Sequence, residues 1–172
     1  MEVLGSETLV LVSEIGCNYL VYAPESGSRR SLELIKKRIT LERITESMRT
    51  AKQIGLVLRG NLIIGFPHET RVDVYQTLWY GLKLTWMGVD EVPIFIYSAY
   101  PGAEIFDGLL ADGVIELNDE YFLSLTSLNS KFTLFGFKTN NPHITPLELA
   151  FYRTTFTLLN YVVGYLCYPT RI

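Results

Sequence analysis

The sequence predicts an α/β fold in which parallel strands alternate with the helices that cover them. Three observations support this. An amphipathic run precedes an apolar, β-rich run three times in succession; a glycine ends each amphipathic run; and a loop containing Pro or Gly follows each apolar one. Helix–strand units of roughly 30–40 residues are typical of parallel strands joined by right-handed crossovers. Three strands cannot close a barrel, so we expect half of an eight-unit barrel or a small open sheet.

The three predicted helices are marked at their C-terminal ends. The units join residues 6–16 to 17–24, 40–55 to 56–67, and 70–88 to 89–102. Their helical runs end at Gly16, Gly55 and Gly88. A helix C-terminus commonly needs one residue in the left-handed conformation, which glycine adopts readily.

Two of the helix starts carry capping signals as well. Thr40 precedes a run of apolar residues at helical spacing and is a predicted N-cap. Thr70 is followed three residues later by Asp73, which is close to a capping box with Asp in place of the usual Glu or Gln. Both signals place a helix start directly after a loop.

Composition limits the class of protein. With 172 residues, of which 48% are hydrophobic, the chain has the length and composition of about one folded domain with its own core. A formal net charge of −3 argues against a broad surface for nucleic acid or acidic lipid, so no nucleic-acid partner is expected. Cys17 and Cys167 are far apart and form no disulfide framework, and together with the absence of a signal peptide they predict a cytoplasmic location.

The loops that follow the three predicted strands share their chemistry. Residues 24–28, 65–69 and 98–104 each contain Gly, Pro and a carboxylate. Ligands of α/β folds bind at the carboxyl ends of the strands, where these loops would meet. Coincidence is one explanation, but three such loops in a row favour a shared site.

The second strand predicts a polar face. Side chains alternate along a strand, so Arg59 and Asn61 share one side of it. A central parallel strand is normally apolar on both sides, and a buried guanidinium is costly without a partner. This side is therefore expected to face a polar, ligand-holding lumen. The alternative is that Arg59 lies at the solvated start of the strand.

The end of the first strand raises a similar question. Alternation places Glu25 at the end of one face, and Ser26, Gly27 and Ser28 follow with hydroxyl groups and backbone amides at the start of a helix. These groups suit a polar or anionic ligand. The alternative is that Ser28 only caps the helix while Glu25 points into water.

Taken in order, the stretches YAPESGSRRSLELIKK, NLIIGFPHET and YSAYPGAEIFDGLLADG resemble the C-terminal half of the radical S-adenosylmethionine barrel. The likeness covers roughly residues 5–113. It is strongest for the branch with a cobalamin-binding N-terminal domain, and the radical S-adenosylmethionine domain of the Elongator and methylthiotransferase type is more distant. It implies a partial, TIM-like barrel with outer helices over residues 1–115, followed by a linker and a helical extension over residues 116–172.

The resemblance also implies which residues bind S-adenosylmethionine. A strand ending in Glu-Ser-Gly-Ser lines the ribose and methionine side of the cofactor in this family, and an arginine six residues before the glycine of the next loop pairs with the methionine carboxylate. The stretch Ile-x-Gly-Phe-Pro-x-Glu supports the adenine. His68 stands where the family usually has glycine, which puts the close approach of this loop in doubt. The cofactor-binding residues expected on these grounds, with Asn61 included because it shares the face of Arg59, are Glu25, Ser26, Ser28, Arg59, Asn61, Ile64, Gly65, Phe66 and Glu69.

One part of the family pattern is absent. The family binds a [4Fe–4S] cluster through Cys-x3-Cys-x2-Cys, and this chain has two cysteines in total. We therefore expect no metal site and no cluster in the chain alone, with the cluster, and cobalamin as a further expectation, confined to a full-length parent. The first strands of the barrel are expected to be missing as well. A complementary N-terminal half-barrel polypeptide, or self-association, would supply them.

Two functions remain open from the sequence. The chain is either the part of a radical S-adenosylmethionine enzyme that contributes cofactor-binding loops, or a catalytically inactive half-barrel kept as an interaction or dimerisation module. Enzyme activity of the chain alone is left uncertain.

The C-terminal region has three possible roles. Residues 154–168 are uncharged, but this run is shorter than the roughly 20 residues that span a bilayer. The alternatives are a helix packed on the outside or bottom of the barrel, a helix in contact with a membrane surface, and a membrane span.

Overall fold

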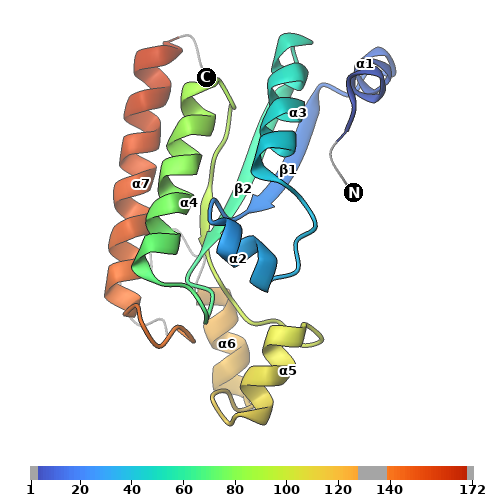
Figure 1. Ribbon diagram of the computed structural model, residues 1–172. Coiled ribbons are helices and arrows are strands. Elements are labelled where there is room, and N and C mark those ends of the chain that lie inside the picture. Colours follow the sequence, from blue (N-terminus) through green and yellow to red (C-terminus); the bar gives the residue numbers. More distant parts are fainter. Residues whose placement is uncertain (1–3, 128–138, 170–172) are drawn as a thin grey trace.

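Three parallel strands form the sheet of this protein (Figure 1). The computed structural model describes residues 4–127 and 139–169. The strands are β1 (Tyr19–Glu25), β2 (Val57–Ile64) and β3 (Ile94–Ile96), and their order in the sheet is β1-β2-β3. This order confirms the predicted α/β fold with parallel strands.

Helices connect the strands and extend the fold at both ends. They are α1 (Ser6–Glu14), α2 (Arg29–Leu34), α3 (Leu41–Gln53), α4 (Arg71–Trp86), α5 (Glu104–Ala111), α6 (Asp119–Ser127) and α7 (Pro146–Cys167). Both α2 and α3 lie in the connection from β1 to β2, and α4 connects β2 to β3. Each connection between strands is therefore a helical crossover, as parallel pairing requires.

The capping signals in the sequence act as predicted. The hydroxyl of Thr40 accepts a hydrogen bond from the backbone of Arg43 at 3.4 Å, and Asp73 closes a capping box by accepting from the backbone N–H of Thr70 at 2.8 Å. The three glycines that follow α1, α3 and α4 have φ angles of 89°, 94° and 98°, in the left-handed region. These local signals define where the helices begin and end.

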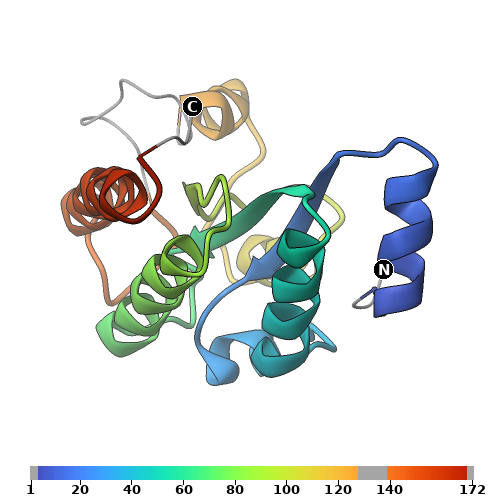
Figure 2. The same ribbon diagram turned by 90° about the horizontal axis from the view of Figure 1, so that it is seen from above.

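The two faces of the sheet differ in their covering. On β2, Leu58 and Leu62 are fully buried, whereas Arg59 and Asn61 between them are partly exposed. Viewed from above, α3 and α4 lie on the same side of the strands (Figure 2). The predicted alternation is confirmed: one face packs under helices and the other, called here the open face, is partly exposed.

Helix α7 packs on the outside of the half-barrel, beside α4 (Figure 1). Its residues Leu149, Tyr152 and Phe156 belong to the same buried cluster as the strands. A methyl group added at Gly81 of α4 would lie 2.7 Å from the Phe156 ring, so glycine is what allows the two helices to approach this closely. The first of the three predicted roles for this region is thus the observed one.

The structure also bears on the membrane alternatives. In the part of the chain that the structure describes, no helix has both the length and the apolar character that crossing a membrane would need. The predicted division near residue 115 stays a prediction, but residues on both sides of it share one core.

A second, smaller cluster lies beyond the carboxyl ends of the strands. Helices α5 and α6 bring Ala99, Phe106 and Ile115 together there, with Tyr121 packed against them (Figure 1). The hydroxyl of Tyr121 donates to the carbonyl of Ala99, which ties α6 to the loop after β3. This cluster places α5 and α6 on the side of the sheet edge where the candidate site lies.

Candidate cofactor-binding site

The end of β1 departs from regular strand geometry at Glu25. Tyr22 pairs with Gly60, but Glu25 pairs with Leu62, so β1 contains one residue more than β2 over this stretch. Pro24 lies inside this bulge, where its missing N–H leaves no gap in the ladder. Glu25 itself has a φ of 69°, a conformation that costs a residue other than glycine about 1–3 kcal/mol. Such strained residues cluster at functional sites.

The carboxylate of Glu25 has a basic partner. It pairs with Nζ of Lys37 at 3.1 Å, and both side chains are partly exposed. Along β1, Tyr22 and Pro24 are buried while Ala23 and Glu25 are only partly so. The bulge shifts the register, so that Glu25 pairs with Leu62 of the covered face, and its place on the open face stays a prediction. The side chain is held by an ion pair instead of standing alone in water.

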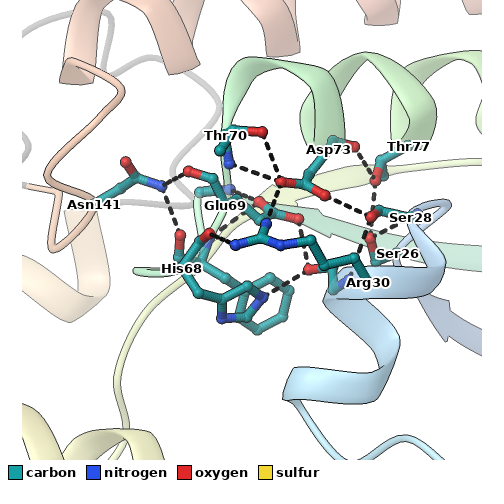
Figure 3. Close-up of polar contacts among 12 residues, drawn as sticks. Ser26, Ser28, Arg30, His68, Glu69, Thr70, Asp73, Thr77 and Asn141 are labelled. Atoms are coloured by element: carbon teal, nitrogen blue, oxygen red, sulfur yellow. Dashed lines mark hydrogen bonds and ion pairs between the residues drawn. The ribbon is translucent and has the colours of Figure 1, made fainter.

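Ser26 and its neighbour Gly27 turn inward, toward α4. The Ser26 hydroxyl is fully buried, lies 3.0 Å from the hydroxyl of Thr77 and accepts a hydrogen bond from the backbone of Ser28 at 3.1 Å (Figure 3). The backbone N–H of Gly27 donates to Thr77 at 3.0 Å. The Ser26 hydroxyl and the Gly27 amide are thus already paired with Thr77 of α4, and the Ser28 amide is paired with Ser26.

Ser28 caps α2 and also reaches α4. Its hydroxyl accepts from the backbone of Ser31 at 3.2 Å and donates to Asp73 at 2.6 Å. The capping role that the sequence left open is therefore confirmed. Contact of Ser26 and Ser28 with a cofactor stays a prediction, and in this structure both hydroxyls are engaged within the protein.

Asp73 is the centre of this network (Figure 3). It accepts from Ser28, from both the backbone and the hydroxyl of Thr70 at 2.8 Å, and from Nη1 of Arg30 at 2.6 Å. Burial alone would raise the pKa of Asp73, but these hydrogen bonds and the charge of Arg30 outweigh it, so the pKa is lowered. One ionised carboxylate thus joins the β1–α2 loop to the start of α4.

Glu69 closes the loop that follows β2. Its buried carboxylate accepts from the backbone of Gly65 at 2.7 Å, from the backbone of Phe66 at 3.2 Å, and from the hydroxyl of Ser31 at 3.0 Å. Gly65 has a φ of 90°, and a side chain there would also collide with Leu149. Burial raises the pKa of Glu69 to about 7, against the lowering effect of the three hydrogen bonds. The predicted role of Glu69 in closing this loop is what the structure shows.

His68 fills the position where the family usually has glycine. Its Nε2 lies 2.8 Å from the Ser31 hydroxyl, its carbonyl accepts from Arg30 at 3.1 Å, and its ring stacks on Phe66 at 5.6 Å between centroids. Burial and the nearby charge of Arg30 lower the pKa of His68. The histidine is therefore built into the loop and links it to α2.

Asn141 is a member of the network that the sequence did not indicate (Figure 3). Its Nδ2 donates to the carbonyls of Phe66 at 2.6 Å and Glu69 at 2.9 Å, across 75 and 72 residues of sequence. Its Oδ1 accepts from the backbone of His143 and Ile144 at 2.7 and 2.9 Å. The only sequence signal is that an Asn before Pro commonly forms a local turn, which explains the second pair of bonds and not the first.

Arg59 and Asn61 lie apart from this network, on the open face of β2. Nε of Arg59 donates to Oδ1 of Asn61 at 2.9 Å, and Nη1 of Arg59 pairs with Glu91 at 3.2 Å. About a third of the Arg59 side chain is exposed. The structure thus brings the ends of β1 and β2 together and places Arg59 and Asn61 further back along β2, on its open face.

The cysteines do not fit a ligand set for an iron–sulfur cluster. Cys17 precedes β1 and is partly exposed, and Cys167 is exposed at the end of α7. In residues 4–127 and 139–169 no group of three or more His, Cys, Asp or Glu side chains is placed to hold a metal ion. A cluster bound by three thiolates therefore has no place among the residues of this chain.

Fold and site together define a class: a partial parallel barrel with a closed, glycine-containing loop at the carboxyl ends of its strands. No protein-family model matches the sequence. The chain is 36% identical over 60% of its length to an uncharacterized methyltransferase of Pyrococcus horikoshii, and 40% identical over 69% to the cytidylyl-2-hydroxyethylphosphonate methyltransferase of Streptomyces wedmorensis. It is also 35% identical over 57% to the ribosomal protein uS12 methylthiotransferase of Rhodospirillum rubrum.

A solved structure has the same fold. Coproporphyrinogen III oxidase from Escherichia coli, described as a radical S-adenosylmethionine enzyme, superimposes with a TM-score of 0.58 over 92% of this chain at 18% sequence identity. The resemblance to half of a radical S-adenosylmethionine barrel is therefore confirmed, in sequence by the methylthiotransferases and in fold by the oxidase. The chain spans 22% and 23% of the two methyltransferases and 30% of the oxidase.

Proposed function

We propose that this chain is the part of a radical S-adenosylmethionine enzyme that supplies cofactor-binding loops but no cluster ligands. One observation carries the proposal: the strained Glu25 and the closed loop of residues 65–69 lie at the ends of neighbouring strands. These are the two places that the family resemblance assigns to the cofactor. Methyl or methylthio transfer is the reaction class that the curated relatives favour. The proposed location is the cytoplasm.

The residues on the open face fit the polar parts of S-adenosylmethionine. Arg59 and Asn61 together offer the guanidinium and amide donors that hold a carboxylate, and the partner they would replace, Glu91, is half exposed. Glu25 would accept hydrogen bonds from ribose hydroxyls in exchange for its ion pair with Lys37. The backbone of Ile64, Gly65 and Phe66 would support the adenine. Bound there, S-adenosylmethionine supplies the chemistry, and the protein supplies binding and orientation.

Ser26 and Ser28 act one step back from the cofactor in this proposal. Their buried hydroxyls hold the β1–α2 loop against Thr77 and Asp73 of α4, which keeps Glu25 in its left-handed conformation. Their contribution in this state of the protein is to position the loop, and contact with the ligand would require these hydrogen bonds to be exchanged.

The [4Fe–4S] cluster and cobalamin are proposed for the remainder of a full-length parent. The two cysteines of this chain do not fit the cluster, so no step of the chemistry is assigned to its residues through that group. A complementary segment that completes the barrel would pair with the outer edge of β1, which is the first strand of the sheet.

The proposal is tested by restoring a barrel. We would join the chain to the barrel segment that precedes the matching region in the Pyrococcus horikoshii relative, and measure S-adenosylmethionine binding by calorimetry. Arg59→Ala should weaken binding by about 2–5 kcal/mol, the usual cost of leaving a buried partner charge unpaired. Its melting temperature should change little, because Arg59 is partly exposed and its partner Glu91 is half exposed, and such surface substitutions change stability by about half a kcal/mol.

Arg49→Ala is the matched control, since Arg49 is an exposed arginine of α3 that pairs with Glu46 in its own helix. It should leave both binding and melting unchanged. A restored barrel that binds no S-adenosylmethionine would refute the proposed function. Equal affinity of the Arg59→Ala protein and its parent would remove Arg59 from the site.

A second candidate is a half-barrel that serves as an interaction or dimerisation module. The observation that favours it is the apolar surface left uncovered at the β1 edge and on α7, where Val21 is 55% exposed and Leu158 is 64% exposed. Binding of S-adenosylmethionine by the restored barrel would decide against this candidate. Self-association without cofactor binding would favour it.

A further inference from the structure

The buried residue Asn141 connects two parts of the chain that the sequence places in different regions. It lies before α7, in the stretch predicted as linker and extension, and only 6% of its surface is exposed. The donor half of its amide is directed at the loop after β2, and the acceptor half at its own turn. All four hydrogen bonds come from one amide side chain.

The donor half is not needed to start α7. Thr145 already caps that helix: its hydroxyl accepts from the backbone of Glu148 at 3.2 Å, and the Glu148 carboxylate accepts from the backbone of Thr145 at 2.9 Å. Glu148 in turn pairs with Arg71 at 2.8 Å. The helix start is thus secured by its own capping box, and the two bonds from Asn141 to Phe66 and Glu69 serve the loop.

Those two bonds pair carbonyl groups of the loop, which the Glu69 carboxylate cannot pair because it is itself an acceptor. The Glu69 carboxylate takes the N–H groups of Gly65 and Phe66, and Asn141 takes the carbonyls of Phe66 and Glu69. The Phe66 carbonyl also accepts from the backbone N–H of Glu69 at 3.0 Å, so Asn141 is a second donor to it. A buried backbone carbonyl without a partner is costly, so the bond to the Glu69 carbonyl is the one that most restricts this loop. The loop is consequently held between α2, through Ser31, and the segment before α7.

We infer that Asn141 is a positioning residue for the adenine-supporting loop. It sets the path of the backbone at residues 65–69 and makes the segment before α7 part of the cofactor site. That Asn141 fixes the loop rests on the observed hydrogen bonds. That it thereby affects cofactor binding rests on the proposed function. It places a determinant of the site beyond residue 115, outside the predicted half-barrel.

The test separates the two halves of the amide. Asn141→Asp keeps an acceptor for the turn and removes the donor, while placing a carboxylate against two carbonyl oxygens. In the full chain, hydrogen exchange at the amides of Gly65 and Phe66 should become faster by about tenfold or more, as expected when a loop loses its restraining bonds. Amides inside α7 should keep their protection, because the capping box at Thr145 is untouched.

Asn118→Asp is the control, because Asn118 is an exposed residue whose Oδ1 accepts from the backbone of Tyr121, a bond that aspartate retains. It should change neither set of amides. Unchanged exchange at Gly65 and Phe66 in Asn141→Asp would overturn the inference. Equally faster exchange throughout the chain, α7 included, would also overturn it and show that Asn141 supports only global stability.

The effect of Asn141 on cofactor binding is measured in the restored barrel. Asn141→Asp should lower S-adenosylmethionine affinity by about tenfold, which corresponds to about 1.4 kcal/mol. If the parent barrel binds no S-adenosylmethionine, the proposed function fails while the exchange result still decides the loop part. If the parent binds and the variant binds equally well, the positioning role in cofactor binding is wrong even though the proposed function stands.

Discussion

Glu69 shows how one carboxyl group can make a loop sensitive to pH. It is fully buried, is surrounded by the donors of Gly65, Phe66 and Ser31, and has His68 and the charged pair of Arg30 and Asp73 nearby. Its pKa of about 7 lies well above the ordinary value of 4.5. The folded protein therefore holds this proton more tightly than the unfolded chain does.

The sign of the resulting pH dependence follows from linkage. A group whose pKa is raised on folding stabilises the folded state fully below about pH 4.5 and loses that contribution as the pH rises through about 7. We predict that the free energy of unfolding falls by on the order of 3 kcal/mol over this interval through Glu69. Denaturant unfolding at a series of pH values would measure it.

Glu69→Gln should remove most of this fall, since glutamine keeps an acceptor and does not titrate. Glu33→Gln, at an exposed position of α2, should leave the pH profile of the parent unchanged. The comparison also separates Glu69 from His68, whose pKa is lowered by burial and by the charge of Arg30. A Glu69→Gln protein with the same pH profile as the parent would contradict the raised pKa.

At the scale of elements, the close packing of α7 on α4 depends on one glycine, Gly81. The Cβ of an alanine at Gly81 would lie 2.7 Å from the Phe156 ring and 2.9 Å from Leu62, closer than real Cβ atoms approach their neighbours. Because the ring is fully enclosed and Leu62 belongs to β2, the steric conflict extends from the helix pair to the sheet. Packing of the C-terminal extension and packing of the half-barrel therefore depend on each other.

We predict that Gly81→Ala destabilises the protein by about 1–3 kcal/mol, the usual cost of overpacking a core. Thermal unfolding would measure it. Gly108→Ala is the matched control, because Gly108 lies inside helix α5 with open space around it, and there alanine should stabilise by up to about 1 kcal/mol through helix propensity. Equal effects of the two substitutions would show that Phe156 does not hold α7 against α4.

The whole molecule presents an incomplete sheet. Both β1 and β3 are edge strands in the order β1-β2-β3, and α7 packs beside β3, whereas β1 has exposed apolar residues such as Val21. An exposed edge strand is a template for pairing with another chain. The open side of the molecule is therefore the side where a further segment or a second copy would bind.

We predict that the chain alone self-associates at tens of micromolar, a working range in which exposed edges commonly lead to association. Sedimentation velocity would detect it. Val21→Lys should shift the population toward monomer by charging the edge, and Leu158→Lys, on the exposed side of α7, tests the other apolar surface. A monomeric parent would contradict the prediction. If Leu158→Lys gives monomer and Val21→Lys does not, the chain associates through α7 and not through the β1 edge.

The sequence by itself determined the features that depend on neighbours a few residues apart. The glycines after α1, α3 and α4, the caps at Thr40 and Thr70, and the alternation along β2 were all predicted, because φ angles and strand faces are set by local sterics and a period of two. The order of three loops was enough to indicate the half-barrel. These predictions needed no knowledge of which distant residues meet.

Only the tertiary structure decided what the polar side chains of the loops contact. Hydrogen bonds join Ser26 to Thr77, Glu69 to Ser31 and Asn141 to Phe66, across 51, 38 and 75 residues of sequence. A buried hydroxyl, carboxylate or amide must be paired, but which partner it takes depends on where the folded chain brings other polar groups, and no local pattern records that position. For this reason the sequence could place these loops at one edge of the sheet but could not foresee the hydrogen bonds that their hydroxyls make within the protein.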